Sequence, residues 1–243
     1  MICGSLEATA QSARMFVADG GDHGCLEEQC ANWNTCSWFL VAVDHWRVIP
    51  SDNSCLFNAV GYVMDHDKNK APELRQVIAA TVASDPTQYS EAFLGKPNEE
   101  YCTWILDPEK WGGAIELAIL AAYYGREIAA YDIQTLRCDL YGQGKNYHER
   151  VMLIYDGLHY DALAMSPSDG APEEFDQTIF MKDGTVGMVE RLALNLVREQ
   201  QRKRSYTDTA NFTLRCGVCQ IGVIGQKEAV ANDFKLRLSI LRC

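Results

Sequence analysis

The segment of residues 50–64 constrains the fold of this chain more than any other. It begins with a proline, which stops a strand predicted over residues 46–49, and residues 51–54 supply side chains that favour turns and helix N-caps. The apolar residues that follow recur at spacings of three and four, which predicts a helix with one buried face: Leu56, Phe57, Val60 and Val63 or Met64. Cys55 is therefore expected in the first turn of a helix.

Further helix and strand patterns follow as far as residue 163. The predicted helices cover residues 72–83, 99–106 and 114–124, and the predicted strands cover residues 127–133 and 150–155. Gly125 is a natural residue to end the third helix. The second strand runs into Asp156-Gly157, a strong hairpin signal, so the chain is expected to return as a strand over residues 159–163. His159 would then lie beside a tight turn.

These patterns divide the chain into four parts. They are an unassigned N-terminal extension (1–45), the patterned region (46–165), an acidic linker or long surface loop followed by an amphipathic helix (166–205) and a tail (206–243). The extension contains cysteines and histidines without periodicity, and its spacing Cys25-x4-Cys30-x5-Cys36 matches no common zinc pattern. The amphipathic helix is predicted over residues 187–204, and its basic end complements the helix dipole.

The charge of the chain excludes some classes of partner. Hydrophobic residues make up 47% of the sequence, enough for a substantial core, and the formal net charge is −11. A surface of that charge repels a phosphate backbone, which argues against nucleic acid and suits a basic protein partner.

The longest apolar run, residues 38–43, is too short to span a bilayer, and no signal-peptide pattern is visible. We therefore expect a cytoplasmic protein without membrane insertion.

The ten cysteines allow more than one interpretation. An even number can indicate a secreted disulfide framework, but the expected reducing compartment favours free thiols. Most of them, such as Cys102 and Cys138, are expected to be small buried hydrophobic residues.

Cys55 is the candidate nucleophile, although a cysteine after a turn, taken alone, is more often a packed thiol. Unpaired N–H groups in the first turn of a helix stabilise a thiolate and can also stabilise an oxyanion. His159 follows the predicted hairpin turn, where a scaffold can hold it rigidly as a general base. Asp161 projects from the same strand face as His159 and can orient it. Asp52 offers a second carboxylate, with an N-cap as its alternative role.

Three sequence blocks, in the same order, resemble OTU deubiquitinases. They are residues 52–57 (DNSCLF), 111–116 (WGGAIE) and 155–161 (YDGLHYD). The resemblance is greatest to the Yod-type branch, whose members work with an ER-associated AAA segregase, and it covers roughly residues 48–230. It implies an α+β, papain-like fold with a central β-sheet flanked by helices, which agrees with the segments predicted above.

The resemblance also implies roles for individual residues. Cys55 would be the nucleophile and His159 the base, with Asp161 or Asp52 as the orienting acid, and Asn53 and the Cys55 backbone would line the oxyanion hole. Gly112-Gly113 would admit the narrow Gly-Gly tail of ubiquitin, or simply give a flexible entry to a helix. Trp111 would be a wall of that channel, or a packing residue elsewhere.

The tail departs from the pattern of this branch, which usually carries a zinc finger with two cysteines and two histidines. Cys216 and Cys219 are in place, but no histidine follows His159. Cys243 and Asp233 could supply further ligands only at an unfamiliar spacing. The residues from 231 onward look as if the family's sequence had been replaced or truncated there, so zinc binding is not expected. No cofactor is required for the expected reaction.

The expected function is hydrolysis at the ubiquitin C-terminus by a cysteine-dependent deubiquitinase. By resemblance, it would remove or trim polyubiquitin in protein quality control (ER-associated degradation), with ubiquitin chains and the AAA segregase as partners. The unfamiliar ends leave an alternative, a non-catalytic ubiquitin-binding adaptor. A papain-like peptidase with other substrates is a third possibility, which the Gly-Gly block disfavours.

Overall fold

The computed structural model describes residues 43–168, 170–209, 213–215 and 222–224. All of them belong to one compact unit that runs from Val41 to Cys243. Two short strands, β7 (Thr213–Arg215) and β8 (Gly222–Ile224), form a separate two-stranded sheet. The remaining elements form the body that carries the site.

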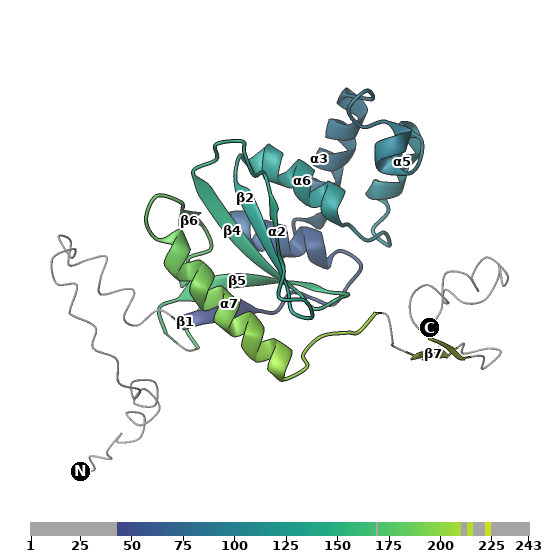
Figure 1. The fold of residues 1–243 in the computed structure, drawn as a ribbon. Helices are drawn as coiled ribbons and strands as arrows, with labels where there is room; N and C mark the ends of the chain where they lie inside the picture. Colours follow the sequence, from purple (N-terminus) through teal and green to yellow (C-terminus); the bar gives the residue numbers. More distant parts are fainter. Residues whose placement is uncertain (1–42, 169, 210–212, 216–221, 225–243) are drawn as a thin grey trace, which may run out of the picture. The chain divides into compact units, whose positions relative to one another are not determined.

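The body contains one mixed sheet and helices on both of its faces (Figure 1). Its strands are β1 (Val43–Arg47), β2 (Glu127–Asp132), β3 (Cys138–Tyr141), β4 (Glu149–Tyr155), β5 (Tyr160–Ser166) and β6 (Phe180–Met181). Its α-helices are α2 (Cys55–Asp65), α3 (Ala71–Ser84), α4 (Glu91–Leu94), α5 (Asn98–Leu106), α6 (Ala114–Tyr124) and α7 (Val186–Arg202). The strand order is β1-β5-β4-β2-β3, with β6 paired to β4. Only β2 and β4 run parallel within this sheet.

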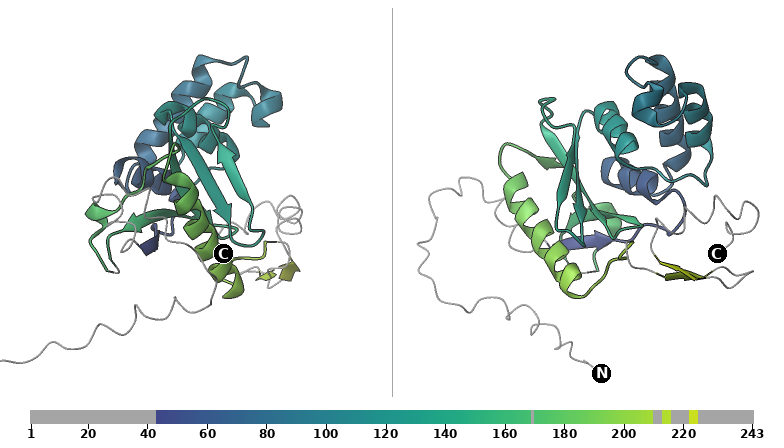
Figure 2. Two further views of the ribbon diagram at one scale, coloured as in Figure 1. Left: turned by 60° about the vertical axis from the view of Figure 1, so that its left-hand side comes forward. Right: turned by 45° about the vertical axis from the view of Figure 1, so that its right-hand side comes forward.

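Alternate residues of the central strands enter two different cores. On β4, Val151 and Leu153 pack with the N-terminal helices, whereas Met152 and Ile154 pack with α7. This alternation follows from the two-residue period of a strand. The views agree that α7 covers one face and that α2, α3 and α6 lie on the other (Figure 2). The expected α+β fold, a central sheet flanked by helices, is confirmed.

Helix α2 is more deeply buried than its predicted single stripe suggests, because every residue from Leu56 to Met64 is buried. It packs against the sheet on one side and α3 on the other. Burial of each large apolar side chain contributes about 1.5–3 kcal/mol, so the helix is anchored along its whole length. Gly61 allows the close approach of the next loop, since a Cβ there would lie 2.4 Å from Cβ of Lys70. The first turn of α2 is therefore a rigid platform.

Residues 166–176, predicted as an acidic linker or a long surface loop, form a largely exposed loop whose two ends are buried in the body. Ser166 ends β5, and Asp176 is 5% exposed. The Asp176 carboxylate accepts hydrogen bonds from Arg47 (2.6 and 2.7 Å) and from Tyr62 (2.5 Å). The acidic residues 173 and 174 are exposed, as the composition indicated, but Asp176 is buried. Its carboxylate is stable inside the protein because it is paired with Arg47. The amphipathic helix that follows is confirmed as α7.

Other expectations differ from the structure mainly at element ends. Helix α6 has the predicted bounds, and Gly125 ends it with φ of 63°. The first strand lies at residues 43–47 rather than 46–49, and α4, β3 and β6 were not predicted. Cys138 is exposed on β3, not buried as expected. Among the described helices, none combines the length and apolar character that a membrane span requires.

Candidate active site

Cys55 is the first residue of α2, and its side chain is half-buried. The residue before it, Ser54, occupies the N-cap position but makes no side-chain capping hydrogen bond. The first N–H groups of a helix have no partner within the helix. These donors, together with the positive end of the helix dipole, therefore remain available close to the sulfur.

His159 is held by the turn between β4 and β5. The Asp156 carboxylate accepts hydrogen bonds from the backbone N–H groups of Leu158 (2.9 Å) and His159 (2.7 Å). Gly157 has φ of 106°, a conformation that residues with a Cβ rarely adopt. The Asp-Gly pair that predicted a hairpin thus also fixes the backbone from which the imidazole projects.

The imidazole of His159 lies between two acceptors and the thiol. Its Nε2 is 3.1 Å from the carbonyl oxygen of Ile49 and 3.1 Å from Oδ1 of Asp161. A carbonyl oxygen cannot donate, so Nε2 must carry the proton. Nδ1 is then the nitrogen left to accept a proton from Cys55, which lies close enough to raise the pKa of the ring. The required tautomer for a general base is in place.

Asp161 is buried, with 5% of its surface exposed, and its position is fixed by three donors. Besides His159, the backbone N–H of Ile49 donates to Oδ1 (2.7 Å) and the indole N–H of Trp46 donates to Oδ2 (2.6 Å). These two contacts were not foreseen, because they depend on the pairing of β1 with β5, which no local pattern encodes.

The surroundings of His159 favour its charged form. The hydrogen bond with Asp161, and next the hydrogen bond with Cys55, raise the pKa of His159 from 6.5 to about 10, although burial acts in the opposite direction. An imidazolium beside a thiol stabilises the thiolate.

Asp52 does not join this group. Its Oδ1 accepts a hydrogen bond from the Ser54 N–H (2.8 Å), and its Oδ2 accepts one from Asn58 (3.4 Å). Asp52 thus closes the turn before α2, close to its expected alternative role at the helix N-terminus. Of the two carboxylates proposed as orienting acids, the structure brings only Asp161 to His159.

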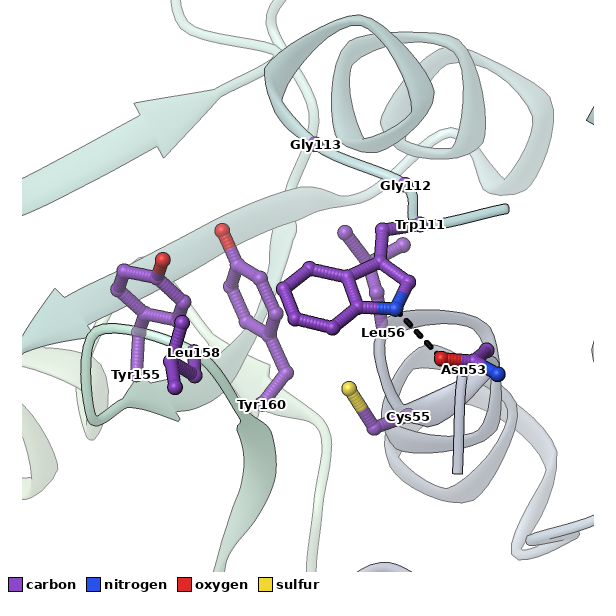
Figure 3. Close-up of a pocket in the computed structure, with 9 residues that line it drawn as sticks. All are labelled: Asn53, Cys55, Leu56, Trp111, Gly112, Gly113, Tyr155, Leu158 and Tyr160. Carbon is purple, nitrogen blue, oxygen red and sulfur yellow. Dashed lines mark hydrogen bonds between the residues drawn. The ribbon is translucent and has the colours of Figure 1, made fainter. Parts of the chain in front are cut away.

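A cavity of about 120 Å³ opens beside the nucleophile. It is lined by Asn53, Cys55, Leu56, Trp111, Gly112, Gly113, Tyr155, Leu158 and Tyr160. The sulfur of Cys55 points toward the space between Trp111 and Tyr160 (Figure 3). Tyr155, Leu158 and Tyr160 were not foreseen, although they belong to the third sequence block. The cavity is narrow, and aromatic rings form much of its wall.

Asn53 and Trp111 connect the two sides of this cavity. The indole N–H of Trp111 donates to Oδ1 of Asn53 (2.6 Å; Figure 3), and Nδ2 of Asn53 donates to Glu109 (3.0 Å). These contacts orient the Asn53 amide, and its Nδ2 has a second N–H that can serve as a donor to an oxyanion beside the backbone N–H groups. Trp111 is 56% exposed, which agrees with a channel wall rather than a core residue.

The two glycines that follow Trp111 have different surroundings. A Cβ on Gly112 would lie 2.8 Å from Cζ of Phe57, whereas a Cβ on Gly113 would meet nothing closer than 3.9 Å. Gly112 is thus required by packing, and Gly113 leaves open space in the cavity. The Gly113 N–H donates to the buried Glu116 carboxylate (2.7 Å), which caps α6.

The proposed zinc ligands Cys216, Cys219, Asp233 and Cys243 lie outside the described residues. Their chemistry can still be compared with the expected finger. A C2H2 site needs two histidines, and this chain has none after His159. The donor set therefore does not fit the finger. Among the described residues, no group of three or more potential metal ligands is found.

Comparisons with known proteins are consistent with this geometry. Residues 50–161 match the model of the OTU-like cysteine protease family, and residues 210–231 match the C-terminal C2H2-type zinc finger of ubiquitin thioesterase OTU1. The chain is 81% identical over 188 residues to an Arabidopsis thaliana protein named OVARIAN TUMOR DOMAIN-containing deubiquitinating enzyme 2 (76% of this chain, 90% of that protein).

More distant relatives are longer than this chain. Ubiquitin thioesterase OTU1 of Danio rerio is 52% identical over 197 residues (79% of this chain, 64% of that protein). The Homo sapiens protein of that name is 49% identical over 185 residues (75% and 52%). A solved structure of an ovarian tumor (OTU) domain in complex with ubiquitin has a TM-score of 0.63 and 28% identity, and the match covers 70% of this chain and 93% of that one.

Proposed function

The chain belongs to the OTU family of cysteine deubiquitinases, and we propose that it hydrolyses the bond between the C-terminal glycine of ubiquitin and a lysine side chain, with Cys55 as nucleophile. One observation carries this proposal: Asp161 Oδ1 lies 3.1 Å from Nε2 of His159, and the pKa of this imidazole is raised by Asp161 and by the neighbouring Cys55. A packed structural thiol needs no such oriented base.

The reaction follows from the protonation state of the pair. The Cys55 thiolate attacks the glycine carbonyl carbon, and the imidazolium of His159 donates its Nδ1 proton to the leaving lysine amine as the C–N bond breaks. The resulting thioester is attacked by water, which gives a proton to the now neutral His159. Hydrolysis releases the ubiquitin carboxylate and the thiolate. Asp161 holds the Nε2 side of the ring and stabilises the imidazolium whenever it forms.

The tetrahedral intermediates place a negative charge on the glycine oxygen. Backbone N–H groups in the first turn of α2, including that of Cys55, can stabilise this charge, and the second N–H of the Asn53 amide is a further donor. The narrow cavity between Trp111 and Tyr160 suits a peptide tail that has no side chains.

A ubiquitin with an electrophilic C-terminal warhead tests the proposal. We expect covalent labelling at Cys55, no labelling of Cys55→Ala, and normal labelling of Cys102→Ala. Cys102 is a suitable control because it is also half-buried, but burial raises the pKa of its thiol. Folded protein that is not labelled would favour the alternative of a non-catalytic adaptor, which would bind ubiquitin chains equally well with and without Cys55.

We also propose a cellular role and a partner for this chain. The resemblance to the Yod-type branch supports trimming of polyubiquitin in ER-associated degradation and an interaction with the AAA segregase in the cytoplasm. Cleavage of a panel of differently linked chains would establish the substrate. Co-purification with the segregase, compared with Cys55→Ala as a trapping variant, would test the partner.

A further inference from the structure

A buried arginine behind the nucleophile has no part in the reaction proposed above. Arg75 lies on α3 and is 2% exposed. Its guanidinium donates to one hydroxyl and four backbone carbonyls: Oγ of Ser54 (3.1 Å) and the carbonyl oxygens of Asn53 (3.2 Å), Ile105 (2.9 Å), Pro108 (3.4 Å) and Lys110 (2.7 Å). None of these partners is a carboxylate.

These acceptors lie behind two walls of the cavity. Asn53 and Ser54 immediately precede Cys55, whereas Ile105 is in the last turn of α5, and Pro108 and Lys110 are on the loop that leads from α5 to Trp111. The walls also meet at the surface through the Trp111–Asn53 hydrogen bond. Arg75 therefore anchors from the inside two loops that the cavity needs at a fixed separation.

Arg75 also contacts the aromatic ring between these walls. Its guanidinium carbon lies 4.1 Å from the ring centroid of Phe57. That ring is the surface against which Gly112 packs, since a Cβ on Gly112 would lie 2.8 Å from it. One guanidinium thus contacts the nucleophile loop, the facing loop and the ring against which Gly112 packs.

The contact with Ser54 has a direct consequence for Cys55. A serine at an N-cap usually accepts a hydrogen bond from the second or third N–H of its helix. Here Oγ of Ser54 accepts from Arg75 instead, and no side-chain cap is formed. The first-turn N–H groups are left without a side-chain acceptor, which is what an oxyanion or a thiolate requires.

Stability alone does not explain this arrangement. Burial lowers the pKa of Arg75, since removing the guanidinium from water penalises its charged form. Its Nε has no hydrogen-bond partner among the described residues. A well-packed apolar side chain commonly stabilises a protein as much as a buried cation, or more.

We infer that Arg75 is a positioning residue, which holds Ser54 and Asn53 so that Cys55 and the first-turn N–H groups of α2 face the cavity. This inference rests on the function proposed above. Arg75 contacts neither substrate nor sulfur; it acts through Ser54 and through the carbonyl groups of the two loops.

The test compares Arg75→Lys with the wild type in the full chain. Lysine keeps the charge but cannot reach acceptors on two loops at once. We expect kcat on a fluorogenic ubiquitin C-terminal amide to fall about 10- to 100-fold, with KM nearly unchanged. We also expect alkylation of Cys55 by iodoacetamide, followed by peptide mass spectrometry, to require a higher pH. The alkylation assay needs no ubiquitin, so it remains informative if the wild type cleaves no ubiquitin substrate and the proposed function itself fails.

Arg150→Lys is a matched control. The Arg150 side chain is also largely buried, and it pairs with Glu127 and Glu190 at the start of β4, roughly 16 Å along the strand from its end at the site. We expect this variant to lower Tm without changing kcat or the alkylation profile. If folded Arg75→Lys behaves in the same way, Arg75 is merely structural and the inference is overturned.

Ser54→Ala keeps the inference testable if Arg75→Lys does not fold. This change removes one anchor and leaves the backbone contacts of Arg75, so we expect a several-fold loss of kcat. A Ser54→Ala protein with wild-type kcat and wild-type alkylation would refute a role through Ser54. Where both variants fold, the double variant should lose little more than Arg75→Lys alone; additive losses would also refute that role.

Discussion

The proton on Nε2 of His159 depends on two acceptors, and only one of them can be changed by mutation without altering the backbone. The Ile49 carbonyl and the Asp161 carboxylate both lie 3.1 Å from this nitrogen. The carbonyl alone can keep the tautomer, but it carries no charge to stabilise an imidazolium. The carboxylate is therefore the group that keeps His159 protonated as the pH rises.

Asp161→Asn should lower kcat by about 10²- to 10⁴-fold. Loss of the charge lowers the pKa of His159, so the alkaline limb of the pH–rate profile should move to lower pH. The asparagine has one acceptor oxygen where the carboxylate has two, so its NH2 group must face at least one of the donors that now surround Asp161. One buried donor left without an acceptor costs about 1–3 kcal/mol of unfolding free energy. Asp52→Asn is the matched control, expected to leave the alkaline limb in place. An equal shift in both variants would contradict the assignment of Asp161.

The raised pKa of His159 also predicts how stability depends on pH. The folded protein binds the proton more tightly than the unfolded chain, since the pKa rises from 6.5 to about 10. The resulting stabilisation is complete below pH 6.5 and is lost as the pH rises through about 10. Urea midpoints of wild type and His159→Gln, measured between pH 6 and pH 10, should therefore converge at the alkaline end. Parallel curves would show that the proton on His159 does not stabilise the fold.

Local patterns identified Cys55, His159 and Asp161, because each has a signal in its own neighbourhood: a helix start, a hairpin turn and a strand alternation. They could not decide between Asp161 and Asp52, since that depends on how β5 lies against the loop before α2. Arg75 was also missed. Its partners are mostly backbone carbonyls, which leave no trace in side-chain patterns.

At the scale of elements, the loop that enters α6 shows two separate requirements for glycine. Gly112→Ala should lower the unfolding free energy by about 1–3 kcal/mol, because the new methyl group meets Phe57 at 2.8 Å. Gly113→Ala has room for its methyl group and should keep the stability of the wild type, but the methyl group narrows the cavity and should raise KM for ubiquitin substrates. Thermal unfolding and steady-state kinetics of the two variants separate these effects. Equal Tm values would contradict the packing role of Gly112.

The segment after α7 lies against the turn that carries His159. The Thr207 N–H donates to the carbonyl oxygen of Asp156 (2.7 Å), and a Cβ on Gly157 would lie 2.4 Å from the Thr207 carbonyl oxygen. Thr207→Pro removes that donor, so we expect a several-fold loss of kcat as the turn loosens. Thr207→Ala keeps the N–H and should behave like the wild type. Equal activity in both variants would show that the contact does not support His159.

The success of prediction also differs between elements. Helix α6 and the hairpin were predicted because Gly125 and the Asp156-Gly157 pair are strong local end signals. β6 is only two residues long and α4 only four, too short for any period to be visible. The first strand was displaced because its position depends on antiparallel pairing with β5 rather than on its own residues.

At the scale of the whole molecule, the body contains all the residues that its proposed chemistry needs, whereas the tail lacks some of the residues that a zinc finger needs. The body has two cores, one on each face of the sheet, and the site lies where α2 meets the ends of β4 and β5. Its chemistry requires a thiol, an imidazole and a carboxylate. The tail retains the Cys216-x2-Cys219 pair but no histidine after His159. Two thiolates alone do not complete a structural zinc site, which takes four ligands.

Removal of metal should therefore leave this protein unchanged. We expect zinc, measured by atomic absorption after dialysis, to lie well below one equivalent per chain. Treatment with 1,10-phenanthroline should alter neither Tm nor kcat, and Cys216→Ser should match the wild type in both. Cys55→Ser is the internal reference for loss of activity at unchanged metal content. Stoichiometric zinc that is lost from Cys216→Ser, together with a lower Tm, would mean that other residues, such as Cys243 and Asp233, complete the site.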